Sequence, residues 1–233
     1  MNEKTVLLAM GNRNPELANR MAERYAEQGY RVHRDDSAGR EDISAFYRDL
    51  EKDGGAVGGC VYFPEPLFTA SLFDADFCDR MEGSVAGDLL NGTWWIQQTS
   101  DHMRRNGAGG YITVLNHVAS IVPTRRYSYC GVAEAALVNV GKVAALDNSA
   151  TAADIRINFI TCGWRESDPE TGAWVEELKI LHKTDTAPII KYVTDLEIVE
   201  ACLAAGQLRG MNGSSLMVDK GFSISRTIKQ MGE

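Results

Sequence analysis

The fold is decided by three segments between residues 110 and 163, which read GYITVLNHVAS (110–120), YSYCGVAEAALVNVGKVAA (127–145) and IRINFITCG (155–163). The first and last contain the apolar runs 110–116 and 155–161, which are typical of buried parallel strands. The middle segment opens a long Ala- and Val-rich helical pattern over 127–149. Strand, helix and strand in this order predict a βαβ unit.

The same alternation extends over the rest of the chain. Further strands are expected at 5–10, 30–34, 55–63 and 215–219, and further helices at 15–28, 43–52, 88–106 and 195–205. No repeat, low-complexity tract or linker interrupts the pattern. We therefore expect residues 1–233 to form a single α/β domain, a doubly wound parallel sheet (Rossmann type) in three layers.

Composition restricts the classes of function. The chain has 233 residues, 44% hydrophobic and 24% charged, and a formal net charge of -8 with scattered Lys and Arg. This balance argues against nucleic acid or an anionic membrane as a partner, although a local basic pocket would still accept an anion. No apolar run approaches the ~18 residues of a membrane span, and no signal-peptide pattern precedes the first strand.

The cysteines give a second indication of the compartment. All five stand alone, without a CxxC pair or a histidine at metal-ligand spacing. Dispersed cysteines in an odd number are typical of reduced thiols in a cytoplasmic protein. We expect a cytoplasmic protein without a metal site.

The order of segments between 110 and 163 resembles the second half of short-chain dehydrogenases/reductases, in which a strand, a Ser-bearing loop, a YxxxK helix, a strand and a Pro-Gly turn follow one another. NGSSLMVDKG (212–221) is similar to that family's closing strand, and TVLLAMGNRNPELANRMAERYAEQGYRV (5–32) to its opening βαβ unit. The resemblance covers nearly the whole chain. It implies a Rossmann domain, an NAD(P) cofactor and a Ser-Tyr-Lys catalytic group.

The phosphate-binding turn of the family departs from its pattern here. The motif TGxxxGxG falls on residues 11–18, so its glycine positions become Asn12, Glu16 and Ala18, while Gly11 takes the Thr position. Side chains occupy the space that a pyrophosphate needs, and Glu16 adds a negative charge beside it. These residues suit a free helix N-terminus better than a dinucleotide.

The adenine side of the pocket is also abbreviated. About a dozen residues between 30 and 43 cannot supply both the helix and the third strand that the family places there. Asp36 lies near the position of an acid that would hold the ribose hydroxyls, but a single Asp after a strand is more typical of a solvated turn.

The catalytic positions of the family are replaced as well. In the register of the resemblance His117 takes the Ser position, Cys130 the Tyr position and Glu134 the Lys position. The Asn position falls on or near Leu89, with Asn91 one slip of register away. A thiol and a carboxylate do not replace a Tyr–Lys pair, because Glu134 raises the pKa of a neighbouring acid, whereas a lysine lowers it.

Neighbouring residues leave an alternative chemistry open. Tyr127 and Tyr129 have Gly131 and Ala133 at +4, and Tyr129 is turned by about 100° from the catalytic position. His117 is able to act as an acid or base near neutral pH, or as a partner of the Cys130 thiol. A histidine at a strand end is more often a hydrogen-bonded structural residue.

Two further segments carry aromatic residues. Residues 164–188 follow the Cys162-Gly163 turn and correspond to the substrate lid, with Trp164, Trp174 and Leu178 as apolar anchors. They cover a pocket or pack on a partner. Residues 94–95 (Trp-Trp) are more typical of core or interface than of ligand contact, because this helix pairs subunits in the family.

A scaffold retained without its chemistry implies a role in assembly. The resemblance therefore predicts a non-catalytic subunit that pairs with an active paralogue, with itself, or with both, through helices 88–106 and 127–149. In that case NAD is bound by the active partner and no cofactor by this chain. Two alternatives remain, a divergent NAD(P)-dependent oxidoreductase that uses His117, Tyr127 or Tyr129, and a small-molecule sensor that reuses the pocket.

Overall fold

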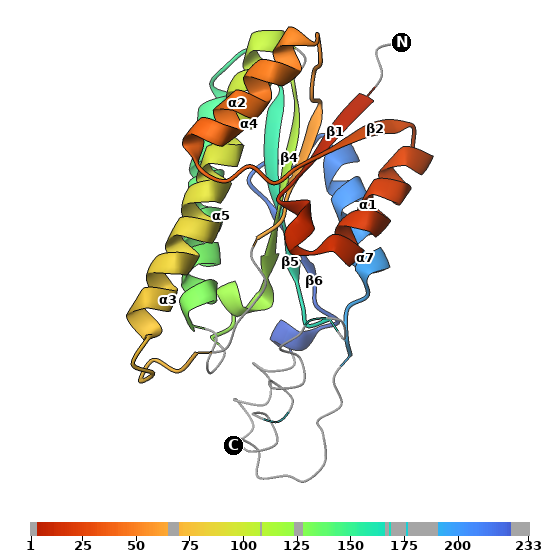
Figure 1. The fold of residues 1–233 in the computed structure, drawn as a ribbon. Helices are drawn as coiled ribbons and strands as arrows, with labels where there is room; N and C mark the ends of the chain where they lie inside the picture. The colour runs from red at the N-terminus through yellow and green to blue at the C-terminus, as the bar shows by residue number, and fades with distance from the viewer. Residues whose placement is uncertain are drawn as a thin grey trace.

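Six parallel strands form one sheet in the order β2-β1-β3-β4-β5-β6 in a computed structural model (Figure 1). The structure describes residues 4–64, 70–107, 109–123, 128–165, 168, 176 and 191–224, without the side chains of 12 and 128–130. The strands are β1 (Lys4–Ala9), β2 (Tyr30–Asp35), β3 (Gly59–Tyr62), β4 (Gly110–His117), β5 (Ile155–Cys162) and β6 (Ser215–Val218). The predicted doubly wound parallel sheet is confirmed, with its topological switch point between β1 and β3.

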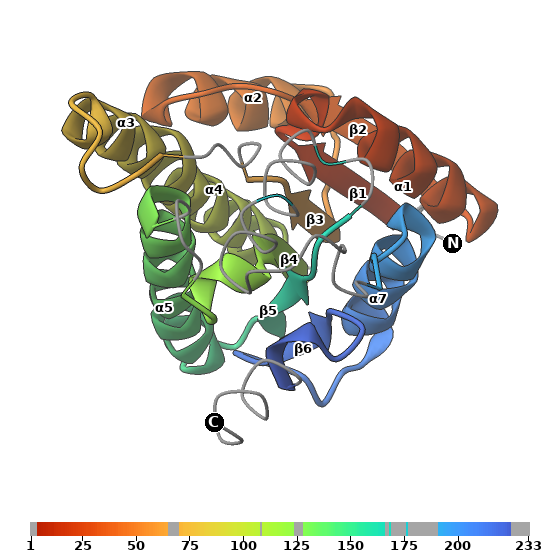
Figure 2. The same ribbon diagram turned by 90° about the horizontal axis from the view of Figure 1, so that it is seen from below.

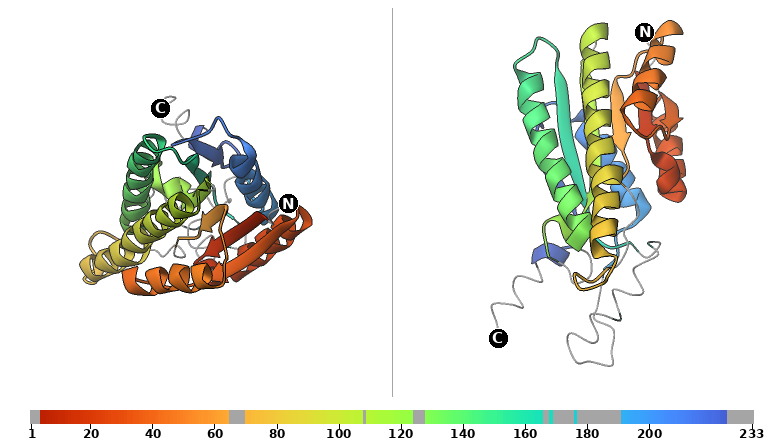
Figure 3. Two further views of the ribbon diagram at one scale, coloured as in Figure 1. Left: turned by 90° about the horizontal axis from the view of Figure 1, so that it is seen from above. Right: turned by 60° about the vertical axis from the view of Figure 1, so that its left-hand side comes forward.

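Helices cover both faces of the sheet, as the three-layer prediction requires (Figures 2 and 3). One face carries α1 (Pro15–Glu27) and α7 (Asp195–Gln207), which pack on each other. The other carries α2 (Arg40–Lys52), α4 (Asn91–Asn106) and α5 (Ser128–Ser149). The carboxyl ends of the strands, and with them the loops that build an α/β site, lie at the lower edge in Figure 1.

The core is built from the apolar runs that identified the strands. Residues 6–9 of β1 are fully buried, as expected for a central strand covered on both faces. On the α4 side Trp95 is also fully buried, with its ring 5.8 Å from that of Phe46. Tyr47 and Thr99 share a buried hydrogen bond of 2.6 Å between their hydroxyls, which ties α2 to α4. Trp95 is therefore a core residue, and Trp94 is half-buried beside it.

The segment after β2 is as short as the sequence implied. β2 ends at Asp35 and α2 begins at Arg40, so the described chain passes directly from one to the other without a further strand. α2 then leads to β3, which pairs with β1 on its other side. β2 is consequently the edge strand, and the sheet has no additional strand beyond it within the described residues.

Two element boundaries differ from the sequence prediction by four residues or more, and the helix expected from 43 begins three residues earlier, at Arg40. The helix expected from 88 begins earlier, because α3 (Phe77–Ser84) and a π-helical segment, η2 (Val85–Leu90), run into α4. Glycines at 83 and 87 conceal this helical stretch, since glycine disfavours a helix interior. The strand expected over 55–63 shortens to β3 because the Gly55 amide donates to the Leu50 carbonyl at 2.9 Å and extends the end of α2.

Three further features of the described residues concern membrane spans, metal ligands and thiols. None of the helices found there has the length and apolar character needed to span a membrane. No group of three or more His, Cys, Asp or Glu in that part of the chain is placed to hold a metal ion. The thiols of Cys60, Cys78, Cys162 and Cys202 are free, and burial raises the pKa of Cys60 and of Cys162 to about 12.

Candidate functional site

A small cavity lies at the carboxyl ends of the central strands, where an α/β fold places its ligand. Its volume is about 80 Å³. The lining residues come from the loops after β1, β3, β4 and β5 and from helices α1, α5 and α7: Asn14, Leu17, Phe63, Pro64, Leu115, Asn116, His117, Glu134, Cys162, Gly163, Arg165, Asp168 and Ile198. The sequence predicted two of these, His117 and Glu134, as members of the site.

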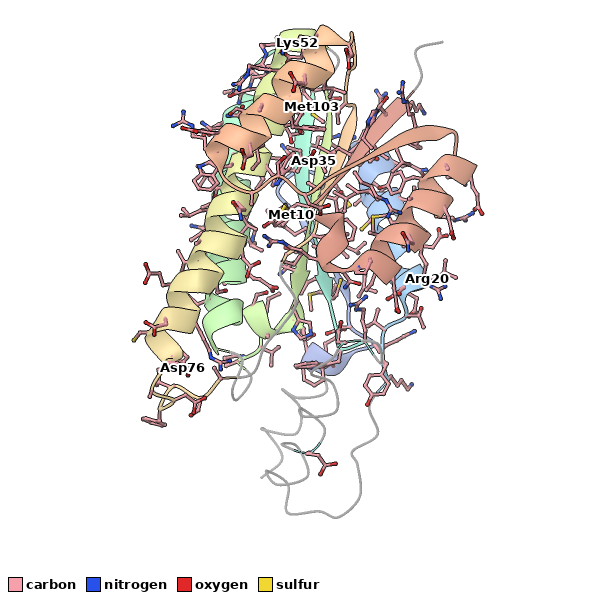
Figure 4. All side chains as sticks on the ribbon, in the orientation of Figure 1. Met10, Arg20, Asp35, Lys52, Asp76 and Met103 are labelled. Carbon is pink, nitrogen blue, oxygen red and sulfur yellow. The ribbon has the colours of Figure 1, made fainter. Side chains whose placement is uncertain are left out.

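The turn between β1 and α1 is closed by its own packing. Met10 adopts φ 64° and donates its amide to the Asp35 carbonyl at 2.7 Å (Figure 4). Such a left-handed conformation is strained for a residue other than glycine. A Cβ atom on Gly11 would lie 3.2 Å from Cβ of Ala18, so the alanine methyl group already fills the space above the turn. Glu16 is exposed in the first turn of α1, where a carboxylate stabilises a free helix N-terminus.

Arg13 crosses the carboxyl edge of the sheet. It belongs to the turn before α1, and its Nη1 donates to the Gly87 carbonyl at 3.3 Å in η2, on the α4 side. The same Nη1 lies 3.9 Å from Oδ1 of buried Asp88, whose Oδ2 accepts from Ser84 Oγ at 3.1 Å. The guanidinium group therefore joins the two helical layers across the edge at which a dinucleotide would lie.

Arg165 forms a second closure, just after β5. It is 8% exposed. Its Nη1 donates to Asp195 Oδ1 at 2.8 Å, and its Nε and Nη2 donate to Asp168 Oδ1, from Nε at 2.9 Å. When the Asn14 side-chain amide is oriented with its oxygen toward Arg165, the oxygen accepts a hydrogen bond from Arg165 Nη2 at 2.5 Å. Burial acts to lower the pKa of Arg165, but Asp168 and Asp195 together raise it above its ordinary value.

This cluster ties three elements together. Arg165 connects the loop after β5 to the start of α1, through Asn14, and to the start of α7, through Asp195. Two carboxylates already surround its single positive charge, so an added phosphate would meet net negative charge. The arrangement stabilises the closed edge of the sheet without offering an anion site.

Glu134 connects α5 to the end of β4. Its side chain is buried, and Oε2 accepts from the His117 backbone amide at 2.6 Å. Burial is the main cause that raises the pKa of Glu134 to about 8, and Asp88 adds to it, while the His117 amide acts in the opposite direction. At neutral pH the carboxyl group therefore holds a proton in most molecules.

His117 is a neutral, buried imidazole. Nδ1 accepts from the Ala119 amide at 3.1 Å, which places the proton on Nε2. The ring meets the Trp164 ring edge to face at 4.4 Å between centroids. Burial, with a smaller contribution from Arg165, lowers the pKa of His117 to about 3. Among the described residues Nε2 meets no hydrogen-bond partner. His117 thus stays neutral at neutral pH, with an unused N–H group at Nε2, and does not become a cationic acid.

The remaining predicted residues do not meet at this cavity. Leu89 packs against the core, and the Asn91 Oδ1 accepts from the Gly39 amide at 2.9 Å, which ties α4 to the loop before α2. Both lie outside the cavity lining, and so does Asp36, which is half-buried in the turn after β2.

Part of the predicted site falls on residues that the structure leaves undescribed. Tyr127 and the lid anchors Trp174 and Leu178 lie outside the described residues, as do the side chains of Cys130, Tyr129 and Asn12. Their proposed roles stay predictions. Of the three predicted lid anchors, Trp164 is described, and its ring is buried against that of His117.

A dinucleotide does not fit the residues present. The methyl group of Ala18 lies against Gly11 where a pyrophosphate would approach the backbone. The cavity of about 80 Å³ is small beside ligand pockets, which occupy roughly 300–1,000 Å³. The described lining residues also contain neither tyrosine nor lysine to move a proton. The described residues at this edge therefore suit a closed turn better than a dinucleotide site.

Sequence reasoning missed the charged residues that close this edge. Arg13 takes a position that the phosphate-turn motif leaves unspecified, and Asp88, Arg165 and Asp195 belong to no motif of the family resemblance. The available signal was position, since Arg13 follows β1 and Arg165 follows β5, at the ends of strands that meet at one edge. Which acid each arginine would reach depended on the packing of distant helices.

Comparisons with known proteins agree with the geometry of the fold. The chain matches the family model described as "Enoyl-(Acyl carrier protein) reductase" over residues 3–223. No curated protein sequence matches it. Similar solved structures include sorbitol-6-phosphate 2-dehydrogenase from Erwinia amylovora, at 16% identity over 93% of this chain and 98% of that one, with a TM-score of 0.79.

Two further structures show the same fold. Gluconate 5-dehydrogenase from Burkholderia cenocepacia, in complex with NADP and tartrate, is 19% identical over 96% of each chain, with a TM-score of 0.74. A short-chain dehydrogenase/reductase from Serratia marcescens is 19% identical over 95% of this chain and 98% of that one, with a TM-score of 0.74. At these identities the similarity establishes the fold alone.

Proposed function

The chain belongs to the short-chain dehydrogenase/reductase family, and we propose that it is a non-catalytic member that pairs with an active paralogue in a hetero-oligomeric NAD-dependent alcohol or hydroxyacyl-CoA dehydrogenase. In this proposal NAD is bound by the partner alone. The chain resembles the non-catalytic subunit type of 2-[hydroxy(phenyl)methyl]-succinyl-CoA dehydrogenase, in which a degenerate and an intact member of the family are combined.

The position of Glu134 carries this proposal. A lysine there would lower the pKa of a catalytic tyrosine, whereas a protonated carboxyl group carries no positive charge with which to do so. Glu134 is instead engaged with the His117 amide at 2.6 Å, so it serves as a connection between α5 and β4. The closures by Arg13 and Arg165 support the same interpretation, because their partners are protein groups on both sides of the cofactor edge.

The surface of α5 supports an assembly role. Three of its apolar side chains are largely exposed, Val132 at 54%, Val143 at 52% and Leu146 at 70%. A groove beside them runs between α4 and α5, lined in part by Trp94, Val140 and Ala144. The two helices lie side by side on the outside of the molecule (Figure 3). An apolar helix pair of this kind is suited to packing against the same pair of a related subunit.

Calorimetric titration of the purified chain with NADH and with NADPH tests the first half of the proposal. We expect no saturable binding below millimolar concentration, because the turn at Gly11 is filled and Arg165 is already neutralised. An intact short-chain dehydrogenase serves as the positive control. Micromolar binding would contradict the proposal and favour the divergent oxidoreductase that uses His117, Tyr127 or Tyr129. A small molecule retained through purification would favour the sensor instead.

Charge placed on α5 tests the assembly surface. We expect Leu146→Glu to convert the oligomer to a smaller species, because a carboxylate would be desolvated in a helix–helix interface. Size-exclusion chromatography with light scattering, on the chain alone and with its co-expressed paralogue, measures this change. Leu196→Glu is the matched control, since Leu196 is 56% exposed on α7, on the opposite face of the sheet. Unchanged assembly in Leu146→Glu would exclude this helix pair as the interface.

A further inference from the structure

A second cavity lies at the opposite edge of the sheet, where the strands begin. Its volume is about 490 Å³, within the range of small-molecule pockets. It is lined by Lys4, Thr5, Tyr30, the loop 56–58, residues 109–111, Asp154, Arg156, the end of α7 at Gly206 and Gln207, and Arg209 in the turn after α7. This edge carries the N-terminal end of β1 and lies uppermost in Figure 1, away from the site described above.

The charge of this cavity is opposite to that of the chain. Lys4, Arg156 and Arg209 contribute three positive charges and Asp154 one negative charge to its lining, against a formal net charge of -8 overall. Within the described part of the chain none of the three cations makes an ion pair with a carboxylate. Lys4 instead lies over the Tyr30 ring, with Nζ 5.8 Å from its centroid. The surplus positive charge favours an anion here.

Arg156 gives the cavity a fixed charge. The residue is 8% exposed, and its Nη1 and Nη2 donate to the carbonyls of Leu208 and Gly206 at 2.8 and 3.0 Å. These carbonyls stand at the C-terminal end of α7, which favours a cation and holds the guanidinium in one position. Its Nε is also buried and meets no hydrogen-bond partner in the part of the chain that the structure describes. Carbonyl groups orient this charge but do not neutralise it, so a ligand anion would complete the arrangement.

Two aromatic side chains, Tyr30 and Tyr111, contribute apolar surface to the lining of the cavity. A Cβ atom on Gly206 would lie 2.7 Å from the Tyr111 ring, and one on Gly59 would lie 2.5 Å from it. The ring is therefore held between two backbone segments. Gly110 has φ 155° and approaches the Gly58 carbonyl so closely that a Cβ would lie 2.6 Å from that oxygen. These glycines accommodate the Tyr111 ring itself, and half-buried Tyr30 offers the larger aromatic surface to a ligand in the cavity.

We propose that this cavity binds a small organic anion, a carboxylate or phosphate group carried on a planar apolar body. The anionic group would lie near Arg156, with Arg209 and Lys4 at the entrance, and the planar body would lie against Tyr30 and Tyr111. This site is separate from the cofactor edge, so it does not depend on whether the chain binds NAD.

Titration with simple probes tests the site. We expect benzoate and phenyl phosphate to bind saturably by ligand-observed NMR or calorimetry at constant ionic strength. Benzamide, which lacks the charge, and inorganic phosphate, which lacks the ring, are expected to bind at least tenfold more weakly. Stronger binding of benzoate identifies a carboxylate ligand, and stronger binding of phenyl phosphate a phosphate ester. Equal binding of benzamide and benzoate, or no saturable binding of either anion, would overturn the proposal.

Two matched variants locate the binding. Arg209→Glu reverses an exposed charge at the entrance and is expected to weaken the binding of the better probe by about tenfold. Arg40→Glu reverses an exposed arginine at the start of α2 and is expected to leave the affinity unchanged. An Arg156→Gln variant is expected to abolish binding, with circular dichroism to verify its fold. Equal affinities for Arg209→Glu and Arg40→Glu would place the probe elsewhere and refute this site.

Discussion

Glu134→Lys is expected to lower the free energy of unfolding by about 3–5 kcal/mol. Glu134 is buried, and its Oε2 accepts from the His117 amide at 2.6 Å. A lysine accepts no hydrogen bond, so the amide would lose its partner while a cation entered the same enclosed space. Urea denaturation of the variant and the parent measures the difference.

The matched control is Glu23→Lys, which makes the same change at an exposed position on α1. Its effect is expected to stay within about 0.5 kcal/mol. A loss of less than about 1 kcal/mol in Glu134→Lys would show that the site accepts a lysine, and the structural role assigned to Glu134 would then be wrong.

Adding Cys130→Tyr to Glu134→Lys restores the residue types of the family's catalytic pair without its phosphate turn. We expect no NAD(H)-dependent turnover from this double variant, because Ala18 still fills the space above Gly11. Appreciable turnover would show that the turn accepts a dinucleotide.

The second large effect is a loss of stability above neutral pH. The pKa of Glu134 is raised from 4.5 to about 8 in the folded chain, so the folded state holds a proton that the unfolded chain releases. The titration of Glu134 therefore lowers the free energy of unfolding as the pH rises from 4.5 to 8. His117, lowered from 6.5 to about 3, contributes the opposite slope between those values. The two slopes cancel between pH 4.5 and 6.5.

Between pH 6.5 and 8 the Glu134 term acts without that compensation. We expect the free energy of unfolding to fall by about 1 kcal/mol across this interval, because the slope diminishes as the pH approaches the folded pKa of Glu134. Glu134→Gln keeps an oxygen that accepts from the His117 amide and removes the titration, so its stability should be nearly constant over the same range. Thermal unfolding at several pH values compares the two proteins. Parallel profiles would refute the assignment of the alkaline loss to Glu134.

The sheet and its long helices could be predicted because each depends on local pattern. Buried parallel strands appear as continuous apolar runs, and residues 110–116 and 155–161 needed no distant information. The helical stretch before Asp88 could not be read, because Gly83 and Gly87 interrupt the pattern and tertiary packing overrides their low propensity. The short connection from β2 to α2 could be predicted from the number of residues between 30 and 43, which is too small for a further helix and strand.

The candidate site was only partly predictable. His117 and Glu134 were found because the resemblance fixed their register, and the structure places them in contact. The pairing of Arg165 with Asp195 could not be predicted, since it depends on how α7 packs against the loop after β5. The shifted pKa values of His117 and Glu134 could not be predicted either, because burial causes both shifts and the sequence does not show how deeply a single His or Glu is buried.

The direct passage from β2 to α2 also bears on how the chain avoids aggregation. It leaves β2 at the margin of the sheet, with one row of backbone N–H and C=O groups that no further described strand covers. Such a margin is a template for strand addition by another molecule. The exposed side chains of Arg31 and Arg34 place positive charge along this edge of the sheet, which opposes such pairing. Replacing these charges with apolar residues would be expected to turn a shortened Rossmann sheet into a surface for fibrous self-association.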